Sequence, residues 1–429
     1  MMRLDAIGLP RFSPWVERGI GVASVLLLFM VKINLLSVGG QSAGLRLDDM
    51  VVFALALLLA IGALFSFRTV IGRVELYAAL IFTLYLTSNA VNLIMFHASN
   101  PLYSFRFVEY FVFFYFGAYY CMSYRLRPLL AWILWVNGIV IILQALGWLG
   151  GFVPGGFTSS TGGRPIGLTG GPWEIGTVIN ICFAYLINDT EKKSSRSFVI
   201  LLFFATLGLV LLTGARMPLI AHLAILFIYF LRQSKRPLLA AMVISAPIAV
   251  LVTGIILIPN PVMERSENLF TTDNVQLLET AYRNIQPTHE QIKFDDEDAD
   301  SSDEDTDASW VIRTMKWAYV IKLWQLTPVA WLIGLGPGAC GPALDGGWTR
   351  ITVETGVIGV LLFVTLLRKI ASCSHAMQGV VVALCINMIM LDTHLAYKAM
   401  SLLFFCVGYG FQEASREKLA ALPAYSPHY

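Results

Sequence analysis

Long apolar stretches recur along the chain, and they restrict its fold more than any other feature. A stretch of about 20 mostly apolar residues is long enough to cross the hydrocarbon core of a membrane as a helix. Backbone that faces lipid must satisfy its own hydrogen bonds, so these stretches are expected to be helical. The sequence therefore predicts an all-α, polytopic membrane protein with about twelve transmembrane helices. The stretches lie near residues 19–38, 49–67, 74–96, 105–123, 128–150, 172–188, 197–213, 217–231, 237–258, 350–367, 376–392 and 398–412.

The composition agrees with this assignment and narrows the functional classes. Of the 429 residues, 57% are hydrophobic and 14% are charged, whereas soluble domains carry about 25% charged residues. The mean hydropathy is +0.69. The six cysteines and six histidines show none of the spacings typical of metal sites. We therefore expect no metal, no cofactor and no nucleic-acid partner, and we expect the lipid bilayer to surround most of the chain.

Lysine and arginine are distributed unevenly between alternate connections, which predicts the orientation in the membrane. The short connections of one set hold five of these residues, namely Arg46, Arg106, Arg164, Arg216 and Lys398. The other set, with both termini, holds 17, namely Arg3, Arg11, Arg18, Arg68, Arg73, Arg125, Arg127, Lys192, Lys193, Arg196, Arg232, Lys235, Arg236, Arg368, Lys369, Arg416 and Lys418. Positively charged loops stay in the cytoplasm. We therefore expect both termini to be cytoplasmic.

Three regions follow from this topology. Residues 1–258 hold the first nine transmembrane helices, and residues 350–429 hold the last three and a cytoplasmic tail. Residues 259–349 form one large extracytoplasmic loop with an acidic segment and an amphipathic helix.

A glycine-rich segment precedes the sixth apolar stretch on the outer side. It reads Gly162-Gly163-Arg164-Pro165-Ile166-Gly167-Leu168-Thr169-Gly170-Gly171-Pro172, and Glu174 follows it. Glycines let the backbone approach a ligand closely, and Pro172 suits the first turn of a helix. The segment is either a flexible turn or part of a binding site, and Arg164 within it favours binding.

A second outer turn, Thr213-Gly214-Ala215-Arg216-Met217-Pro218, joins the seventh and eighth stretches. One helix is expected to end near Gly214 and the next to begin near Pro218. Arg216 then lies at a helix N-terminus, where free N–H groups and the helix dipole favour an anion such as phosphate. The alternative is an arginine that contacts lipid headgroups, and we favour the phosphate. His222 is expected to be a hydrogen-bonded core residue.

The large outer loop contains Arg283 and then an acidic run. Residues 295–307 hold nine carboxylates, and such runs are usually disordered and solvated; a cation-binding patch and a mobile lid are the alternatives. Beyond the run, Arg313 and Trp317 are four residues apart. They therefore share one face of a helix, and the neighbouring tryptophans indicate that this helix lies at the membrane interface.

The end of the outer loop carries a second glycine-rich segment, Gly334-Leu335-Gly336-Pro337-Gly338, followed by Asp345 and Arg350. Asp345 is expected to be either a helix cap or a catalytic carboxylate. The tenth stretch then contains Glu354-Thr355-Gly356-Val357-Ile358-Gly359, whose glycines allow close helix packing. Near the last outer turn, Asp392, His394 and Lys398 are expected to pair with one another or to contact an anionic substrate.

Taken in this order, the segments resemble those of the bacterial O-antigen polymerase (Wzy-type) and O-antigen ligase superfamily. The resemblance covers roughly residues 150–400. The ligase branch carries a histidine nine residues before the glutamate of the last motif, where this chain has Asp345, so the chain is more similar to the polymerase branch. The matching residues are Arg164 to Pro172, Thr213 to Arg216, Arg313 with Trp317, Gly334 to Gly338 and Glu354 to Gly359.

This resemblance implies a GT-C-like glycosyltransferase of the bacterial inner membrane, with its active site facing the periplasm and no need for a metal. Its substrates would be undecaprenyl-diphosphate-linked glycans. The enzyme would be a polysaccharide repeat-unit polymerase that transfers a growing glycan from undecaprenyl diphosphate to a lipid-linked repeat unit, with inversion. A chain-length regulator of the polysaccharide co-polymerase type is an implied partner.

The same resemblance places the essential arginines of the family at Arg216 and Arg313. Arginines aimed at a diphosphate stabilise the charge that develops as it leaves, and Asp345 would accept the proton of the attacking hydroxyl. We therefore predict Arg216, Arg313 and Asp345 as catalytic residues. The predicted substrate-binding residues are Arg164, Arg283, Glu174, Arg350 and Lys398.

Three other functions are compatible with a polytopic protein of this kind. An O-antigen ligase would transfer the glycan to lipid A core. A multi-helix lipid or solute transporter usually shows two related halves and charged or broken helices at the membrane midplane, and we find no such repeat in the sequence. A scaffold for polysaccharide assembly would need none of the arginines.

Overall fold

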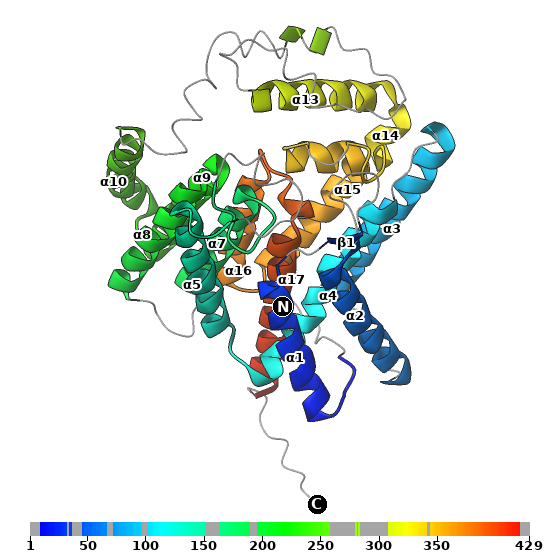
Figure 1. Cartoon of the computed structure of the whole chain (residues 1–429), viewed down its shortest axis with the longest axis horizontal. Coiled ribbons are helices and arrows are strands. Elements are labelled where there is room, and N and C mark those ends of the chain that lie inside the picture. The colour runs from blue at the N-terminus through cyan, green and yellow to red at the C-terminus, as the bar shows by residue number, and fades with distance from the viewer. Residues whose placement is uncertain are drawn as a thin grey trace, which may run out of the picture.

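The computed structural model describes a bundle of helices (Figure 1). The acidic run 295–307 and Gly162-Gly163 lie outside the residues that it describes. The described residues are 9–31, 34–36, 45–66, 72–96, 101–150, 164–188, 195–257, 279–280, 282–283, 308–340 and 344–420.

Helices dominate the described residues, and two short strands form the exception. The strands β1 (Asn34–Leu36) and β2 (Leu45–Arg46) pair antiparallel. The fold is therefore helical apart from this ribbon. The helices are α1 (Pro14–Phe29), α2 (Leu47–Ser66), α3 (Arg73–Phe96), α4 (Pro101–Ser123), α5 (Leu126–Ala145), α7 (Pro172–Asn188), α8 (Arg196–Thr213), α9 (Arg216–Gln233), α10 (Pro237–Leu257), α13 (Ala308–Leu326), α14 (Pro328–Ile333), α15 (Gly347–Ala371), α16 (His375–Asn387), the 3₁₀ turn η2 (Thr393–Leu395) and α17 (Tyr397–Ala420).

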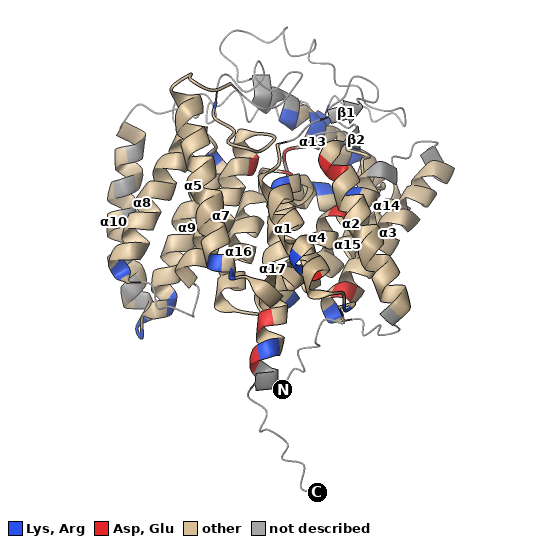
Figure 2. Cartoon of the chain, turned by 60° about the horizontal axis from the view of Figure 1, so that its bottom comes forward, with Lys and Arg blue, Asp and Glu red and all other residues tan. Residues whose placement is uncertain are grey.

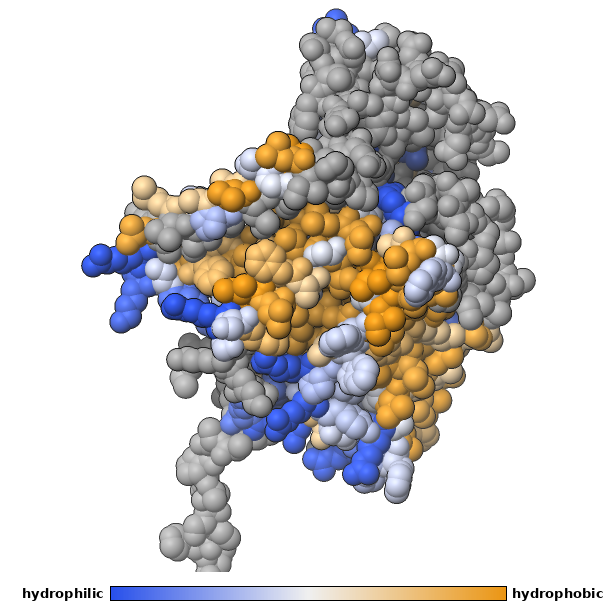
Figure 3. Space-filling model, turned by 60° about the vertical axis from the view of Figure 1, so that its left-hand side comes forward, coloured by the Kyte–Doolittle hydropathy of each residue, from blue (hydrophilic) through white to orange (hydrophobic). Residues whose placement is uncertain are grey.

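The helices have the length and surface expected in a membrane. Each of the twelve predicted stretches overlaps one helix. Within the described ranges, α2, α3, α5, α8 and α15 are long and apolar enough to cross a membrane on their own. Large apolar side chains such as Trp135, Phe204 and Leu361 are more than half exposed. Figure 3 shows a broad hydrophobic face with hydrophilic residues below it. Soluble monomers rarely expose so large an apolar area, so the chain is a helical membrane protein.

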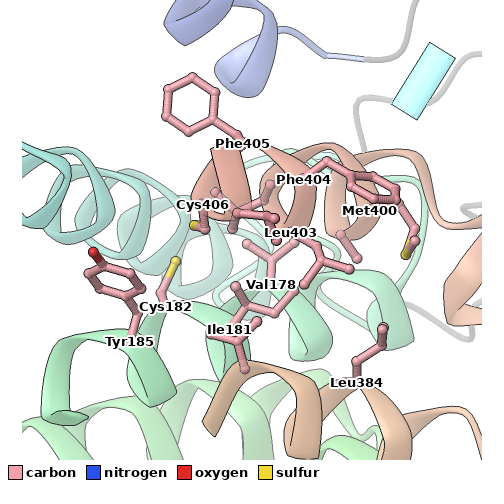
Figure 4. Packing of buried hydrophobic residues seen from close by; sticks show 14 of the residues in the cluster. Val178, Ile181, Cys182, Tyr185, Leu384, Met400, Leu403, Phe404, Phe405 and Cys406 are labelled. Carbon is pink, nitrogen blue, oxygen red and sulfur yellow. The ribbon is translucent and has the colours of Figure 1, made fainter. Parts of the chain in front are cut away.

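The centre of the bundle is the contact between α4 and α17. A Cβ atom on Gly117 would collide with the carbonyl of Phe405, and one on Gly408 would collide with the carbonyl of Phe114. The two glycines thus let two helix backbones touch, as small residues do between membrane helices. Around this contact, buried side chains of α7, α16 and α17 pack together (Figure 4).

Several helices differ from their predicted bounds, and the first and the eleventh end early for reasons that the structure shows. The first begins at Pro14 and ends at Phe29, because Met30 adopts extended backbone (φ −63°, ψ 132°) that leads toward β1. The predicted stretch 19–38 is therefore wrong as a single helix. The eleventh, predicted over 376–392, ends as α16 at Asn387. The carbonyls of Met388 and Leu391 beyond it turn to accept hydrogen bonds from the start of α15.

Helix α15 is broken at Gly356, which has a left-handed φ of 64° with ψ −170°. The break frees the carbonyls of Val353 and Glu354, which accept hydrogen bonds from Leu335 N (2.8 Å) and Gly336 N (3.0 Å). Non-helical backbone at membrane depth requires such internal partners. The loop that follows α14 therefore docks against the middle of α15.

Basic residues lie at one end of helices α8 and α9. Figure 2 shows lysines and arginines at the ends where α8 begins and α9 ends. We call this the basic end. The opposite end holds the loop 164–171, the α8–α9 turn and residues 388–396, which join successive helices there. Helix α13 runs across that opposite end (Figure 1).

Candidate functional site

An ion pair between Arg313 and Asp345 lies at the end opposite the basic end. Arg313 of α13 donates from Nε to Asp345 Oδ2 at 2.6 Å, and the two side chains are 28% and 30% exposed. Within the described part of the chain, the two Nη groups of Arg313 make no hydrogen bond. The structure thus brings two of the predicted catalytic residues together, and it leaves both side chains partly exposed.

Asp345 adopts a strained backbone conformation. It is the one non-glycine residue with positive φ (56°) among those that the structure describes. Aspartate tolerates this region better than most residues, but such conformations persist only where the surroundings impose them, often at functional sites. A helix cap needs no such strain. Asp345 precedes α15, whose N-cap is Gly346, so the helix-cap role weighed from the sequence does not describe it.

The carboxylate of Asp392 holds this conformation in place. Its Oδ2 accepts the backbone N–H groups of Leu344 (2.8 Å) and Asp345 (3.2 Å), and its Oδ1 accepts that of Gly346 (3.1 Å). Three consecutive N–H groups therefore converge on one buried side chain, which is 6% exposed.

Arg350 links Asp392 to Glu354. Its guanidinium is completely buried, donating from Nε to Glu354 Oε1 at 3.0 Å and from Nη1 to Asp392 Oδ2 at 2.9 Å. It also lies 5.6 Å from the ring centroid of Tyr103. The sequence predicted Arg350 as a substrate-binding residue. Its enclosure instead makes it a support for the residues around Asp345. We call Arg350, Glu354 and Asp392 the buried network.

The glycine-rich segment after α14 completes the buried network. Gly338 donates its N–H to Glu354 Oε1 at 3.0 Å, and Ser88 of α3 donates to the Glu354 carbonyl at 3.2 Å. A Cβ atom on Gly334 would collide with the backbone of Glu354. The glycines therefore allow two backbones to meet beside the site.

Trp317 fixes the position of α13 over this segment. Its Nε1 donates to the carbonyl of Leu344 at 2.8 Å, one residue before the partner of Arg313. The prediction that Arg313 and Trp317 share one helix face is confirmed, because both side chains reach adjacent residues of the same loop.

Burial and neighbouring charges shift the pKa values of two residues in the turn between α16 and α17. Burial alone would raise the pKa of Asp392, but Arg350, His394 and the N–H groups of Leu344 and Gly346 together hold this pKa below its usual value. Burial lowers the pKa of His394 to about 4, despite the attraction of Asp392. At pH 7 Asp392 is therefore ionised and His394 is neutral.

The predicted pairing of Asp392, His394 and Lys398 with one another is wrong for Lys398. Asp392 binds Arg350, whereas Lys398 Nζ donates to the carbonyl of Leu27 at 2.6 Å. The 3₁₀ turn η2 lies between Asp392 and Lys398, and the two side chains therefore contact different neighbours.

Glu174 and Lys398 form a second buried contact. Glu174 Oε2 accepts the N–H of Gly170 (2.8 Å), and Oε1 accepts the N–H of Lys398 (2.7 Å). Both side chains are nearly buried, at 5% and 6% exposed. These two predicted substrate-binding residues therefore tie the loop 166–171 to the start of α17.

The other predicted arginines lie on different elements. Arg216 begins α9, as the N-terminal placement predicted, although the helix starts two residues before Pro218. The neighbours of α9 are chiefly α7, α8, α10 and α16, whereas those of α13 are α14 and α15. No contact within the described ranges joins Arg216 to Arg313. Arg164 is half-buried in the loop before α7.

Arg283 pairs with Glu279 on the exposed surface, one helical turn away. Its carbonyl accepts a hydrogen bond from Lys322, toward the far end of α13 from Arg313. His222 is a satisfied core residue as predicted, with Asn180 at 2.9 Å and Thr206 at 3.1 Å from its ring nitrogens.

Sequence reasoning missed the buried network. Asp392 was named only as a member of a turn, and Glu354 only as part of a motif. The available signal was the presence of three charged residues, Arg350, Glu354 and Asp392, inside or beside apolar stretches, where charges are rare and need partners.

Within the described ranges, no group of three or more His, Cys, Asp or Glu side chains is arranged to hold a metal ion. The fold and the site thus define a helical membrane protein with a partly exposed Arg–Asp pair supported by a buried network. No family model matches the chain, and no curated protein matches it either.

Proposed function

We propose that the chain is a lipid-linked polysaccharide repeat-unit polymerase, and that Arg313 and Asp345 form its catalytic pair. One observation carries the proposal: Arg313 uses only Nε to bind Asp345, and Asp345 is held in a strained conformation by buried charges. Such a pair presents a cation and a carboxylate side by side, which is what glycosyl transfer from a diphosphate requires.

The proposed reaction uses both groups. A hydroxyl of the acceptor sugar attacks the anomeric carbon of the donor glycan, and the bond from this carbon to the diphosphate oxygen breaks, with inversion. The Nη groups of Arg313 bind the departing diphosphate, because a guanidinium fork matches phosphate oxygens and keeps its charge. Asp345 Oδ1 accepts the proton of the attacking hydroxyl. No metal enters this scheme.

Arg216 and Arg313 lie on different helices, and we assign them to two different lipid-linked substrates. The donor and the acceptor would each carry undecaprenyl diphosphate. We assign the donor diphosphate to Arg313, beside the carboxylate, and the acceptor diphosphate to the region of Arg216 and Arg164. Arg216 lies at the start of α9, where the helix dipole favours an anion.

The membrane placement of the proposal follows the charge distribution. We assign about twelve spans, a GT-C-like architecture and both termini to the cytoplasm of a bacterial inner membrane, so that Asp345 faces the periplasm. The positive-inside rule supports this orientation. A chain-length regulator of the polysaccharide co-polymerase type is the proposed partner.

The experiment uses the full chain in proteoliposomes with a lipid-diphosphate-linked repeat unit. We expect Arg313→Ala to lower the rate of chain growth by a factor of about 100 or more, in the range seen when one transition-state donor is removed. We expect Asp345→Asn to lower it by at least about tenfold. Product length on gels is the measurement, with membrane insertion verified for each variant.

Two matched controls remove one cation and one carboxylate at other positions of the chain. Lys322→Ala removes a cation from the same helix, and Asp49→Asn removes a carboxylate that pairs with Arg106. Both should retain normal polymer. The proposal fails if Arg313→Ala also gives polymer of normal length, or if the purified wild-type chain moves the lipid-linked unit across the bilayer without joining units.

A further inference from the structure

A recess lies at the basic end, far along the helices from Asp345. It forms where α9 and α15 end and α16 begins, and its volume is about 350 Å³. The recess is shallow and open, so it can receive a polar group at the surface but does not enclose one.

Two arginines from different helices line the recess. Arg232 belongs to the last turn of α9, and Arg368 belongs to the last turn of α15. Within the described part of the chain, neither guanidinium forms an ion pair or a hydrogen bond. The dipole at a helix C-terminus favours a cation, which accounts for each arginine separately. It does not account for two like charges that line the same recess.

The opposite wall of the recess is apolar and comes from α16. Val381 and Val382 follow Gln378 by three and four residues, so the three side chains share one helix face. Gln378 Oε1 lies 3.3 Å from His375 Nδ1. The recess thus combines two arginines, a polar amide side chain and an aliphatic surface.

We propose that this recess binds the headgroup of an anionic phospholipid from the adjacent leaflet. The two guanidinium groups hold the phosphodiester, because planar forks match phosphate oxygens, and the acyl chains extend past the half-buried Val382. A free phosphate ion gains nothing from the valines, so the apolar wall favours a lipid. The site is separate from the Arg313–Asp345 pair and does not depend on the proposed polymerase activity.

The test measures lipid retention by the detergent-solubilised full chain with native mass spectrometry. The lipids are dioleoylphosphatidylglycerol and dioleoylphosphatidylcholine, which share acyl chains and differ in net charge. We expect the wild-type chain to retain phosphatidylglycerol preferentially. Arg232→Gln/Arg368→Gln should weaken this retention about thirtyfold, or about fivefold per arginine. If the double variant cannot be purified, each single substitution should show its fivefold loss.

A charge-matched control is Lys235→Gln/Arg236→Gln, which removes two exposed cations just beyond α9 that do not line the recess. This control should retain phosphatidylglycerol like the wild type. The proposal is overturned if the control loses as much as the recess variant, if both lipids bind equally, or if the recess variants bind like the wild type. Displacement of the lipid by 10 mM inorganic phosphate would likewise overturn it in favour of a soluble anion.

Discussion

Asp392→Asn is the substitution that tests the buried network most directly. The carboxylate of Asp392 accepts three backbone N–H groups and the Nη1 of Arg350. Asparagine has nearly the same shape but only one acceptor oxygen, and its NH₂ group would face N–H donors. Arg350 would also lose one of its two carboxylate partners while remaining fully buried.

The magnitude follows from these contacts. Removing one partner of a buried ion pair costs about 3–5 kcal/mol. We take about 3 kcal/mol, because Glu354 still pairs with Arg350. If the cost falls on the local structure, opening of residues 344–346 becomes about 150 times more frequent, since each 1.4 kcal/mol is a factor of ten. Asp345 would then lose its left-handed conformation for more of the time, and proposed catalysis would fall with it.

Cysteine labelling measures this opening. Cys340 is 7% exposed and close to Glu354, whereas Cys182 of α7 is fully buried and far along the chain. Two reporter proteins, each with one of these cysteines and alanine at the other five, are labelled with a maleimide in detergent at constant pH. We expect Asp392→Asn to raise the labelling rate of Cys340 by about a hundredfold. Cys182 should change much less.

Asp49→Asn serves as the control, because it removes another carboxylate with an arginine partner. It should leave Cys340 labelling unchanged. A Cys340 rate within threefold of wild type in Asp392→Asn would refute the reasoning. Equal acceleration of both cysteines would also refute it, because the network would then support the whole bundle and not this loop.

Three further substitutions and one control substitution test other parts of the structure. The pKa of His394 is about 4 in the folded chain and 6.5 when exposed. Between these two pH values the unfolded chain binds a proton at His394 that the folded chain does not bind. The free energy of unfolding is therefore highest above pH 6.5 and decreases as the pH falls toward 4. The loss is about 3 kcal/mol, and denaturant unfolding of His394→Gln should lack it. Gly356→Ala should lower the midpoint of thermal unfolding because its left-handed φ and tight contact with α14 exclude a Cβ; the cost is at least about 1–2 kcal/mol. Gly208→Ala, in open space within α8, should be neutral or stabilising in the same assay. Glu174→Gln should lower the free energy of unfolding by about 1–3 kcal/mol, because one of the two buried N–H groups that Glu174 binds loses its acceptor. An unchanged midpoint of thermal unfolding would contradict the view that Glu174 joins loop 166–171 to α17.

Much of the helical framework was predictable because length and apolarity directly reflect the membrane. Pro172 begins α7, and Gly214, with φ 64°, caps α8, because proline and glycine have strong positional preferences. The spacing of Arg313 and Trp317 also placed both side chains correctly on one face. These are local rules, and each involves residues within one turn of the chain.

The buried network was not predictable by such rules. Arg350 and Asp392 are 42 positions apart, and nothing in the spacing shows that Asp392 pairs with Arg350 and not with the nearer Lys398. The break of α15 at Gly356 was not predicted, because the apolarity of a stretch indicates that it is buried but gives no information on the φ angle of a single residue. The contacts of Glu174 could not be foreseen for a similar reason. Its partners are backbone N–H groups, which every residue except proline offers.

The arrangement of charges itself indicates what the network is for. Replacing a buried ion pair by well-packed apolar residues is often neutral or stabilising, so stability alone does not explain a fully buried Arg350 with two carboxylates. Its bonds lead through Asp392 to the N–H groups of residues 344–346. At the centre of those three residues is Asp345, strained and partly exposed, with Arg313 against it. At its other end, Glu354 of the network accepts the N–H of Gly338 in the glycine-rich loop. The network therefore fixes the backbone that carries the Asp345 carboxylate and holds the glycine-rich loop beside it.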